Sequence, residues 1–201
     1  MSSDYEFEKI YNDFSPKILQ YVTRMVDRND AEDIVQIIFD RINRGLEGFQ
    51  EKSRLSTWIY RIATNTIIDM SRSAAYKNAA AHAPMEDDAD HDPQAVAKDN
   101  RPPSTDQLVI RKEMNECIKE HIDKLPHDYK TVIVLSELEG MANKEISEIL
   151  DISLDNAKIR LHRARARLKT LLNEACDFYY TDDNTLACDR KQVSILPKPP
   201  K

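Results

Sequence analysis

Glycine and cysteine are both scarce in this 201-residue chain, which has three residues of each. Glycine supplies the positive-φ backbone that tight hairpin turns and phosphate-binding loops use, so its scarcity argues against a turn-rich all-β fold and a glycine-cradled nucleotide site. Three cysteines are too few and too scattered for a disulfide framework, and an odd number fits a reducing compartment. We therefore expect a helical protein without structural disulfides.

Long apolar runs are missing as well. No run approaches the roughly 18 residues that span a bilayer, and the first residues carry no signal-peptide core. We expect a cytoplasmic protein with no membrane insertion. The chain also lacks a paired-histidine metal motif. Its acidic stretch has no fold that would hold two carboxylates at a fixed separation, so we do not expect an enzyme.

An acidic, proline-rich stretch divides the chain. Between residues 84 and 99, six acidic residues face a single base, and four prolines fall between 84 and 103. Such a segment cannot bury enough apolar area to offset its ordering entropy, which predicts a flexible linker. The sequence therefore predicts an all-α fold of two small helical domains, with these bounds: first domain 1–75, linker 76–103, second domain 104–175 and a C-terminal extension over 176–201.

Apolar residues recur at three- and four-residue steps through the first domain, the period of one buried helical face. A helical segment is predicted over 7–25, with a kink or a division into two helices at Pro16. A second helix follows the capping residue Asp30, and a third begins near Ser53 or Ser56 and runs toward Met70. Three such helices form a small bundle.

The second domain repeats this pattern. A capping box over 104–107 precedes a predicted helix over 108–122, which Leu125-Pro126 stops because the residue before proline avoids helical geometry. A helix over 132–138 is predicted to end at Gly140. Two further helices follow, separated by three residues from Asp151 to Ser153.

Those last two helices carry the strongest functional signal. A short helix, a three-residue break and a long basic helix form the helix-turn-helix arrangement, which lays its second helix into the major groove of DNA. At about 100° per residue, one arc of the long helix is apolar and packs inward: Leu154, Ala157, Leu161, Ala164, Leu168 and Leu171. The nearly opposite side carries Lys158, Ile159, His162 and Arg163.

Between residues 155 and 169 there are six basic residues and one acidic residue. This predicts a surface that binds phosphates, although the chain as a whole is acidic. We expect Lys158 and Arg163 to reach base edges. We expect the remaining basic residues to bind phosphates, including Arg160, Arg165 and Arg167. Whether His162 touches DNA or sits at the rim stays open.

Two blocks of residues resemble bacterial extracytoplasmic-function (ECF) sigma factors, a subfamily of the sigma-70 family. The first block is similar to region 2 of that family: Asp30-Ala-Glu-Asp-Ile-Val-Gln36, Phe39, Ser56-Thr-Trp-Ile-Tyr-Arg-Ile-Ala63 and Asn65. The second resembles region 4: Leu125-Pro126, Leu138-Glu-Gly140, Glu145-Ile146 and Ala157-Lys-Ile-Arg-Leu-His-Arg-Ala-Arg165. Their order, with a linker and no region 3 between them, makes the resemblance specific.

The resemblance implies a promoter-specificity subunit of RNA polymerase. We expect no cofactor. Region 2 would contact the β′ coiled coil of core RNA polymerase through Asp30, Glu32, Asp33, Gln36 and Phe39. Region 4 would meet the β flap and read the minus-35 element of promoter DNA. An anti-sigma factor and a role in stress response are also implied.

The third helix and the loop before it would open and hold the minus-10 strand through Lys52, Arg54, Trp58, Tyr60, Arg61 and Asn65. Their aromatic surface, charge and amide suit unstacked bases, which are captured by stacking, backbone charge and hydrogen bonds to exposed edges. Trp58 lies in register with Leu55 and Ile62, which favours a core role for it, so Tyr60, Arg61 and Asn65 are the stronger candidates.

Two positions depart from the family pattern. Ile37 stands where members usually have glutamate, which adds an apolar side chain to the polymerase-docking helix. Asp151 replaces the usual glycine before the turn, but aspartate tolerates left-handed backbone geometry, so we expect the turn to form.

The C-terminal extension carries Cys176 and Cys188. Eleven residues between two cysteines is not a zinc-knuckle spacing, and four ligands would require Cys117, His162 or acids from elsewhere. We therefore expect no metal here. A metal-sensing or redox role for the two cysteines is the alternative.

Two other functions fit a helix-turn-helix chain. A free-standing dimeric regulator would bind operators without polymerase and would use the first domain for a ligand or for dimerisation, which requires half-site symmetry in its DNA. A helical adaptor that binds only protein is the third interpretation.

Overall fold

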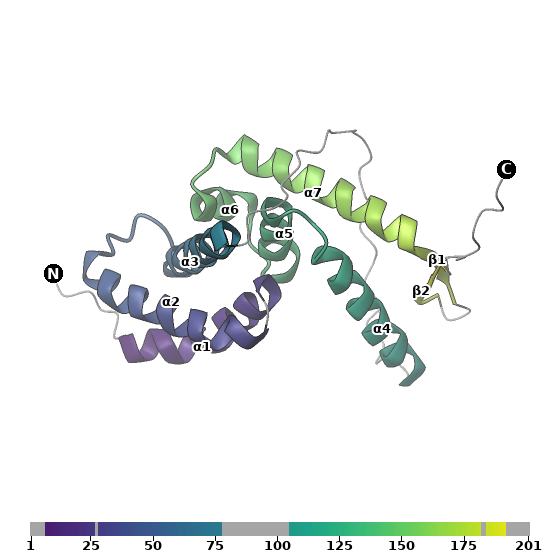
Figure 1. Ribbon diagram of the computed structural model, residues 1–201, viewed down its shortest axis with the longest axis horizontal. Coiled ribbons are helices and arrows are strands. Elements are labelled where there is room, and N and C mark those ends of the chain that lie inside the picture. The colour runs from purple at the N-terminus through teal and green to yellow at the C-terminus, as the bar shows by residue number, and fades with distance from the viewer. Residues whose placement is uncertain (1–6, 27, 78–104, 182–183, 192–201) are drawn as a thin grey trace. The chain divides into compact units, whose positions relative to one another are not determined.

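The computed structural model describes residues 7–26, 28–77, 105–181 and 184–191, and helices make up most of them (Figure 1). The elements of these residues are α1 (Phe7–Met25), η1 (Arg28–Asp30), α2 (Ala31–Gly45), η2 (Leu46–Gly48), α3 (Leu55–Lys77), α4 (Thr105–Ile122), α5 (His127–Ile133), η3 (Val134–Leu138), α6 (Asn143–Leu150), α7 (Leu154–Ala175), β1 (Cys176–Tyr180) and β2 (Leu186–Arg190). Among the described helices, none combines the length and the apolar character needed to cross a bilayer.

The chain divides into two compact units. Unit 1 combines residues 1–88 with 126–164, and unit 2 combines residues 89–125 with 165–201. The first part of α7, through Ala164, therefore belongs to unit 1, and the rest of this helix belongs to unit 2.

Helices α1, α2 and α3 pack together in unit 1, as predicted for the first domain (Figure 1). Their core is made of fully buried isoleucines and valine: Ile18, Val22, Ile38, Ile42, Ile59 and Ile67. The buried Thr64 hydroxyl donates to the carbonyl of Tyr60 at 2.7 Å, so its oxygen accepts from the Tyr21 phenol at 2.9 Å. This pair joins α1 to α3 within the core.

Pro16 does not divide α1. The helix runs unbroken from Phe7 to Met25, so the alternative of two helices is wrong. Apolar residues are buried on both sides of the proline, including Ile10 before it and Ile18 after it. Tertiary packing of this face stabilises the helix, and it offsets the hydrogen bond that proline cannot make.

Helix α5 begins five residues before the predicted start. Its first residue, His127, directly follows Pro126, whose carbonyl accepts the amides of Tyr129 and Lys130 at 2.9 Å. Proline is well suited to a helix start because its φ is fixed and the first turn has no use for its missing amide hydrogen. The helix continues as the π-helical turn η3 and ends, as predicted, before Gly140, which has a φ of 68°.

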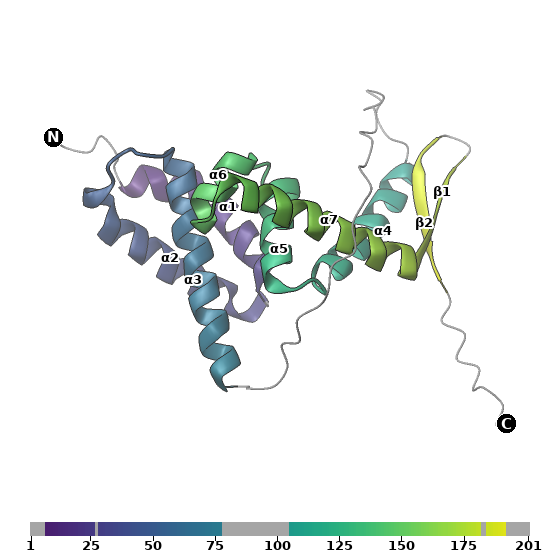
Figure 2. The ribbon, with the colours of Figure 1, turned by 90° about the horizontal axis from the view of Figure 1, so that it is seen from above.

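In unit 1, η3 and α6 pack against each other, and α6 lies against α3 (Figure 2). Ile146 and Ile149 of α6 and Leu135 of η3 are fully buried. The helix-turn-helix segment and the three-helix bundle therefore share one compact unit in this structure.

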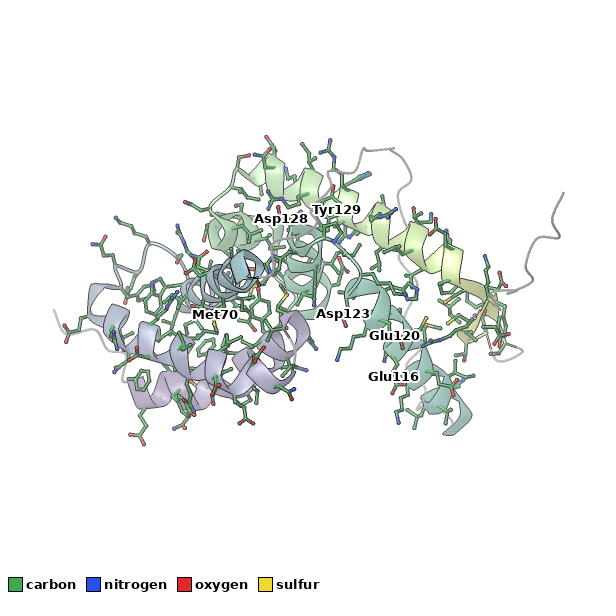
Figure 3. The ribbon with its side chains drawn as sticks, in the orientation of Figure 1. Met70, Glu116, Glu120, Asp123, Asp128 and Tyr129 are labelled. Carbon is green, nitrogen blue, oxygen red and sulfur yellow. The ribbon has the colours of Figure 1, made fainter. Side chains whose placement is uncertain are left out.

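Unit 2 contains α4 and a hairpin that the sequence did not predict. Strands β1 and β2 are antiparallel, with Cys176 opposite Arg190 and Phe178 opposite Cys188. The hairpin lies against α4, where the guanidinium of Arg190 donates to Glu120 at 2.9 Å (Figure 3). α4 begins at Thr105, and Ser104 of the predicted capping box lies outside the described residues.

Candidate nucleic-acid interface

The turn between α6 and α7 forms as the sequence predicts. Asp151 adopts left-handed geometry, with φ 55° and ψ 45°, and its amide donates to the carbonyl of Ser147. The amide of Ile152 donates to the same carbonyl at 3.1 Å, which closes the end of α6. Ser153 then accepts the amide of Asn156 on its side-chain oxygen at 3.2 Å, so a serine caps the start of α7.

The inner side of α7 is apolar. Ala157, Leu161 and Ala164 are buried, as their positions on the helix predict. The prediction is wrong at Leu154, whose side chain is 41% exposed. Side chains of a helix point back toward its N-terminus, and Leu154 has no preceding turn of α7 to cover it.

The opposite side of α7 carries basic and apolar side chains together. Lys158, His162 and Arg163 are exposed, and Ile159 is 49% exposed among them. Lys158 pairs with Asp155 of the same helix at 3.6 Å, an exposed contact that holds the ammonium weakly. This face therefore combines positively charged side chains with an exposed apolar one.

The other basic residues of α7 that were predicted to bind DNA differ in their exposure. Arg160 is half-buried and lies 3.9 Å from Asp128 of α5, which Figure 3 labels. Arg165 is exposed and Arg167 is half-buried, and both lie on the part of α7 that belongs to unit 2. Arg160 therefore has a packing role beside any contact with DNA.

Tyr60 is buried, although the sequence favoured it over Trp58 as a DNA contact. Its ring lies edge-on to Tyr21 at 5.3 Å, and its phenol donates to Glu139 at 2.7 Å. The same carboxylate accepts a charged hydrogen bond from Arg24, and the Glu139 side chain is only 7% exposed. Burial, followed by the hydrogen bond to this carboxylate, raises the pKa of Tyr60 far above its ordinary value.

Trp58 is half-buried, beside Phe49 at 5.0 Å between ring centroids. Gly45 of α2 lies beneath the indole, and a Cβ at that position would meet Trp58 Cζ2 at 3.1 Å. The absence of a side chain at Gly45 therefore lets the indole pack against α2. The indole is thus only partly covered, whereas the core role that the sequence favoured for Trp58 would bury it.

The other predicted minus-10 residues lie on the surface of unit 1. Lys52 and Asn65 are exposed. Two exposed arginines pair with the helix-turn-helix segment: Arg54 donates to Glu145 at 3.2 Å, and Arg61 lies 3.3 Å from Asp151. The structure thus brings the minus-10 candidates against the segment that carries the minus-35 candidates.

The predicted polymerase contacts fall into two groups. Asp30, Glu32, Asp33 and Gln36 are exposed at η1 and along α2, and Ile37 beside them is 38% exposed. Phe39 is 4% exposed and packs edge-on to Tyr11 at 4.8 Å. Phe39 is therefore part of the core beneath α2 and does not lie on the exposed surface of this helix.

Glu139 has a structural role that sequence reasoning missed. It joins Arg24, 115 residues earlier, to Tyr60, 79 residues earlier, in one polar network. It lies within the Leu138-Glu-Gly140 block quoted for the family resemblance, but no local pattern indicates such distant partners.

Comparison with known proteins agrees with this arrangement. Residues 10–76 match the family Sigma-70 region 2, and residues 115–168 match Sigma-70, region 4. The chain is 36% identical to the ECF RNA polymerase sigma factor SigW of Bacillus subtilis over 84% of this chain and 89% of that protein. It is 32% identical to RNA polymerase sigma factor SigZ of the same organism, over 84% of this chain and 88% of that protein.

Solved structures show the same fold. Sigma factor RpoE of Bartonella quintana, crystallised with the anti-sigma factor NepR, matches with a TM-score of 0.60 at 21% identity, over 83% of this chain and 96% of that one. CnrH in complex with the cytosolic domain of CnrY matches with a TM-score of 0.57 at 22% identity, over 84% and 88%. The fold, the two family matches and the sequence relatives agree: the chain belongs to the ECF subfamily of sigma-70 RNA polymerase sigma factors.

Proposed function

We propose that this sigma factor binds core RNA polymerase in the cytoplasm and directs it to promoters as a non-enzymatic subunit. Region 2, over residues 1–75, opens the minus-10 segment, and region 4, over 104–175, binds the minus-35 duplex. The observation that carries this proposal is the tight helix-turn-helix with an exposed basic face on α7, in a chain whose net charge is −6.

Region 2 docks on the β′ coiled coil through the exposed side of α2. Asp33 and Gln36 lie on that side, and Asp30 and Glu32 add carboxylates at its start. Ile37 supplies an apolar contact where the family usually has a charge. Interfaces of this kind combine an apolar centre with hydrogen-bonding polar groups around it. Region 4 binds the β flap.

In the minus-35 element, Lys158 and Arg163 hydrogen-bond to base edges in the major groove. Ile159, half-exposed between them, meets the methyl group of a thymine, which is the apolar feature of that groove. The basic side chains around them bind phosphates and set the position of the helix: Arg160, Arg165 and Arg167, with His162 at the rim of the interface.

In the minus-10 segment, Asn65, Arg61 and the aromatic side chains hold the separated strand, with Lys52 and Arg54 on its backbone. Tyr60 and Arg61 are engaged with Glu139 and Asp151 in this structure. Capture of DNA by those two residues therefore requires these contacts to break. Binding to core polymerase supplies the free energy that breaks these contacts.

An anti-sigma factor is the second proposed partner, and it links the sigma factor to a stress stimulus. RpoE of Bartonella quintana is described in complex with the anti-sigma factor NepR, and CnrH is described in complex with the cytosolic domain of CnrY. The partner would hold the sigma factor away from polymerase until the stimulus releases it.

Gel filtration with core RNA polymerase tests the proposal. The chain should co-elute with core polymerase, and the complex should bind a promoter fragment that is already melted over its minus-10 segment. Binding of a palindromic operator by the chain alone, as a dimer and without affinity for core polymerase, would contradict the proposal and support a free-standing regulator.

A further inference from the structure

All three cysteines of the chain meet at one point of unit 2. Cys117 lies on α4, Cys176 is the first residue of β1, and Cys188 lies on β2. Their three Sγ atoms lie within 4.8 Å of one another, and those of Cys117 and Cys176 are 3.2 Å apart. Cys117 and Cys176 are buried, and Cys188 is half-buried.

The spacing of these sulfurs suits a tetrahedral metal ion. A zinc ion with Zn–S distances of about 2.3 Å holds its sulfur ligands about 3.8 Å apart, which lies within the range of this cluster. A disulfide would use only two of the three thiols and would leave the third beside it without a function. The convergence of three thiols from three separate elements therefore points to a cation.

His121 lies one helical turn after Cys117 and is 4% exposed. Its Nδ1 is 2.8 Å from the carbonyl oxygen of Cys117 and 3.9 Å from the sulfur of the same residue. A proton on Nδ1 is donated to that carbonyl, which leaves Nε2 with its lone pair. Nε2 is buried and has no hydrogen-bond partner among the described residues. Neither ring nitrogen of His121 belongs to the group of ligand atoms that the three thiols form, so the cysteines alone define the site.

The hairpin buries few of its side chains against the rest of unit 2. Cys176 is the buried residue of β1, and the other four residues of that strand are exposed. An isolated two-stranded hairpin is marginally stable in water, and the exposed pair of Arg190 and Glu120 contributes little. A metal ion bound to the inward-facing thiols would supply the missing folding free energy.

We propose that Cys117, Cys176 and Cys188 bind one Zn²⁺ as thiolates, and that the ion fastens the C-terminal hairpin to α4. The three thiolates supply three of the four ligands of a tetrahedral zinc ion. Each thiol releases its proton to solvent as its Zn–S bond forms. The site is independent of the promoter-binding residues.

A reactive redox centre fits the cluster less well. Cys117 and Cys176 are buried, and Cys188 is half-buried. Redox-sensing cysteines, in contrast, have accessible sulfurs.

Metal content and cobalt spectroscopy test the site on the full chain. The protein purified without chelator should contain one zinc per chain. After removal of the zinc, titration with Co²⁺ should give thiolate-to-cobalt charge transfer and the intense visible bands of tetrahedral cobalt, with saturation at one equivalent. Absence of retained zinc together with no tetrahedral cobalt spectrum would overturn the proposal.

Substitutions assign the ligands. Cys117→Ser, Cys176→Ser and Cys188→Ser should each weaken Co²⁺ binding by at least about 100-fold, the upper end of the loss seen when only an outer-shell partner is removed. Asn115→Ala, on the exposed side of α4, is the matched control and should bind cobalt like the unaltered chain. Cobalt binding that is unaffected by the cysteine substitutions would overturn the site.

Hydrogen exchange on the unaltered chain keeps the test independent of how well the variants fold. Chelation of the zinc should increase amide exchange in residues 176–190 at least about tenfold, because an ion worth more than 1.4 kcal/mol to the hairpin no longer holds it closed. Exchange in α2 should not change. Unchanged exchange in the hairpin after zinc removal, or a disulfide among the three cysteines in the protein as purified, would contradict the proposal.

Discussion

The phenol of Tyr60 donates a 2.7 Å hydrogen bond to the carboxylate of Glu139, which also accepts from Arg24. The network joins α1 and α3 to the segment that follows η3, and its carboxylate is nearly buried. A buried carboxylate requires partners of this kind, because an unpaired charge in such a position is strongly destabilising. The residue that the family resemblance assigns to DNA capture is thus part of the internal polar structure of unit 1.

Replacement of Glu139 should destabilise unit 1. Glu139→Ala leaves the guanidinium of Arg24 and the hydroxyl of Tyr60 without their acceptor, and we expect the free energy of unfolding to fall by about 2 kcal/mol. Tyr60→Phe keeps the ring packing on Tyr21 and should cost about 1 kcal/mol. Urea unfolding, followed by the fluorescence of Trp58, the single tryptophan of the chain, measures both changes. Glu47→Ala, at an exposed position, is the control, and an equal loss there would contradict the assignment.

Alkaline pH should weaken unit 1 through its two core tyrosines. Burial raises the pKa of Tyr21 and of Tyr60 above the ordinary value of about 10. The folded state therefore retains protons that the unfolded state releases, so this contribution to stability is complete below about pH 10 and is lost as the pH rises above it. Urea unfolding midpoints measured between about pH 9 and about pH 11 should fall less steeply for Tyr60→Phe than for the unaltered chain. Identical slopes for the two proteins would refute the prediction.

Arg163 and Arg167 should differ in how they affect minus-35 binding. Arg163→Ala should weaken binding at specific base pairs by about 1–3 kcal/mol, because a side chain at a base edge distinguishes sequences. Arg167→Ala should lower affinity evenly across sequences and reduce the salt dependence, because a phosphate contact does not distinguish them. Binding of a duplex library by the holoenzyme measures both effects, with the exposed Lys9→Ala of α1 as the control. Equal, sequence-independent losses for both arginines would refute this division of roles.

Asn65 should act in strand opening and not in duplex binding. Its side chain is exposed on α3, and an amide there can hydrogen-bond to the edge of an unpaired base. Asn65→Ala should leave minus-35 duplex binding unchanged and reduce permanganate reactivity of thymines in the minus-10 segment. Asn12→Ala, exposed on α1, is the matched control. An unaltered permanganate footprint for Asn65→Ala would count against the role in melting.

Gln36 and Phe39, three residues apart on α2, should separate binding from folding. Gln36→Ala should lower affinity for core polymerase and leave the unfolding free energy within about 0.5 kcal/mol, because its side chain is exposed. Phe39→Ala should cost about 3–5 kcal/mol of stability, because it removes a buried ring that packs on Tyr11. Titration of labelled core polymerase and urea unfolding measure the two effects. A stable Phe39→Ala protein with impaired polymerase binding would place Phe39 at the interface instead.

Local sequence patterns were sufficient for the helix-turn-helix. The turn depends on neighbouring residues, so Asp151 and the three-residue break could be recognised directly, and the helical period correctly placed Ala157 and Leu161 inside. Tyr60 was harder to place, because its burial depends on Glu139, which lies 79 residues away. Spacing within the C-terminal extension likewise could not show that the thiol of Cys117 lies beside Cys176.

The most direct test of the central claim is transcription in a defined system. Core RNA polymerase is combined with the purified chain and with genomic fragments, and the transcripts are mapped. We predict initiation at specific sites that core polymerase does not use alone, and its loss when Arg163 and Asn65 are both replaced by alanine. The contrary result, in which the transcripts are the same with and without the chain at low salt and with no inhibitor present, would contradict the account.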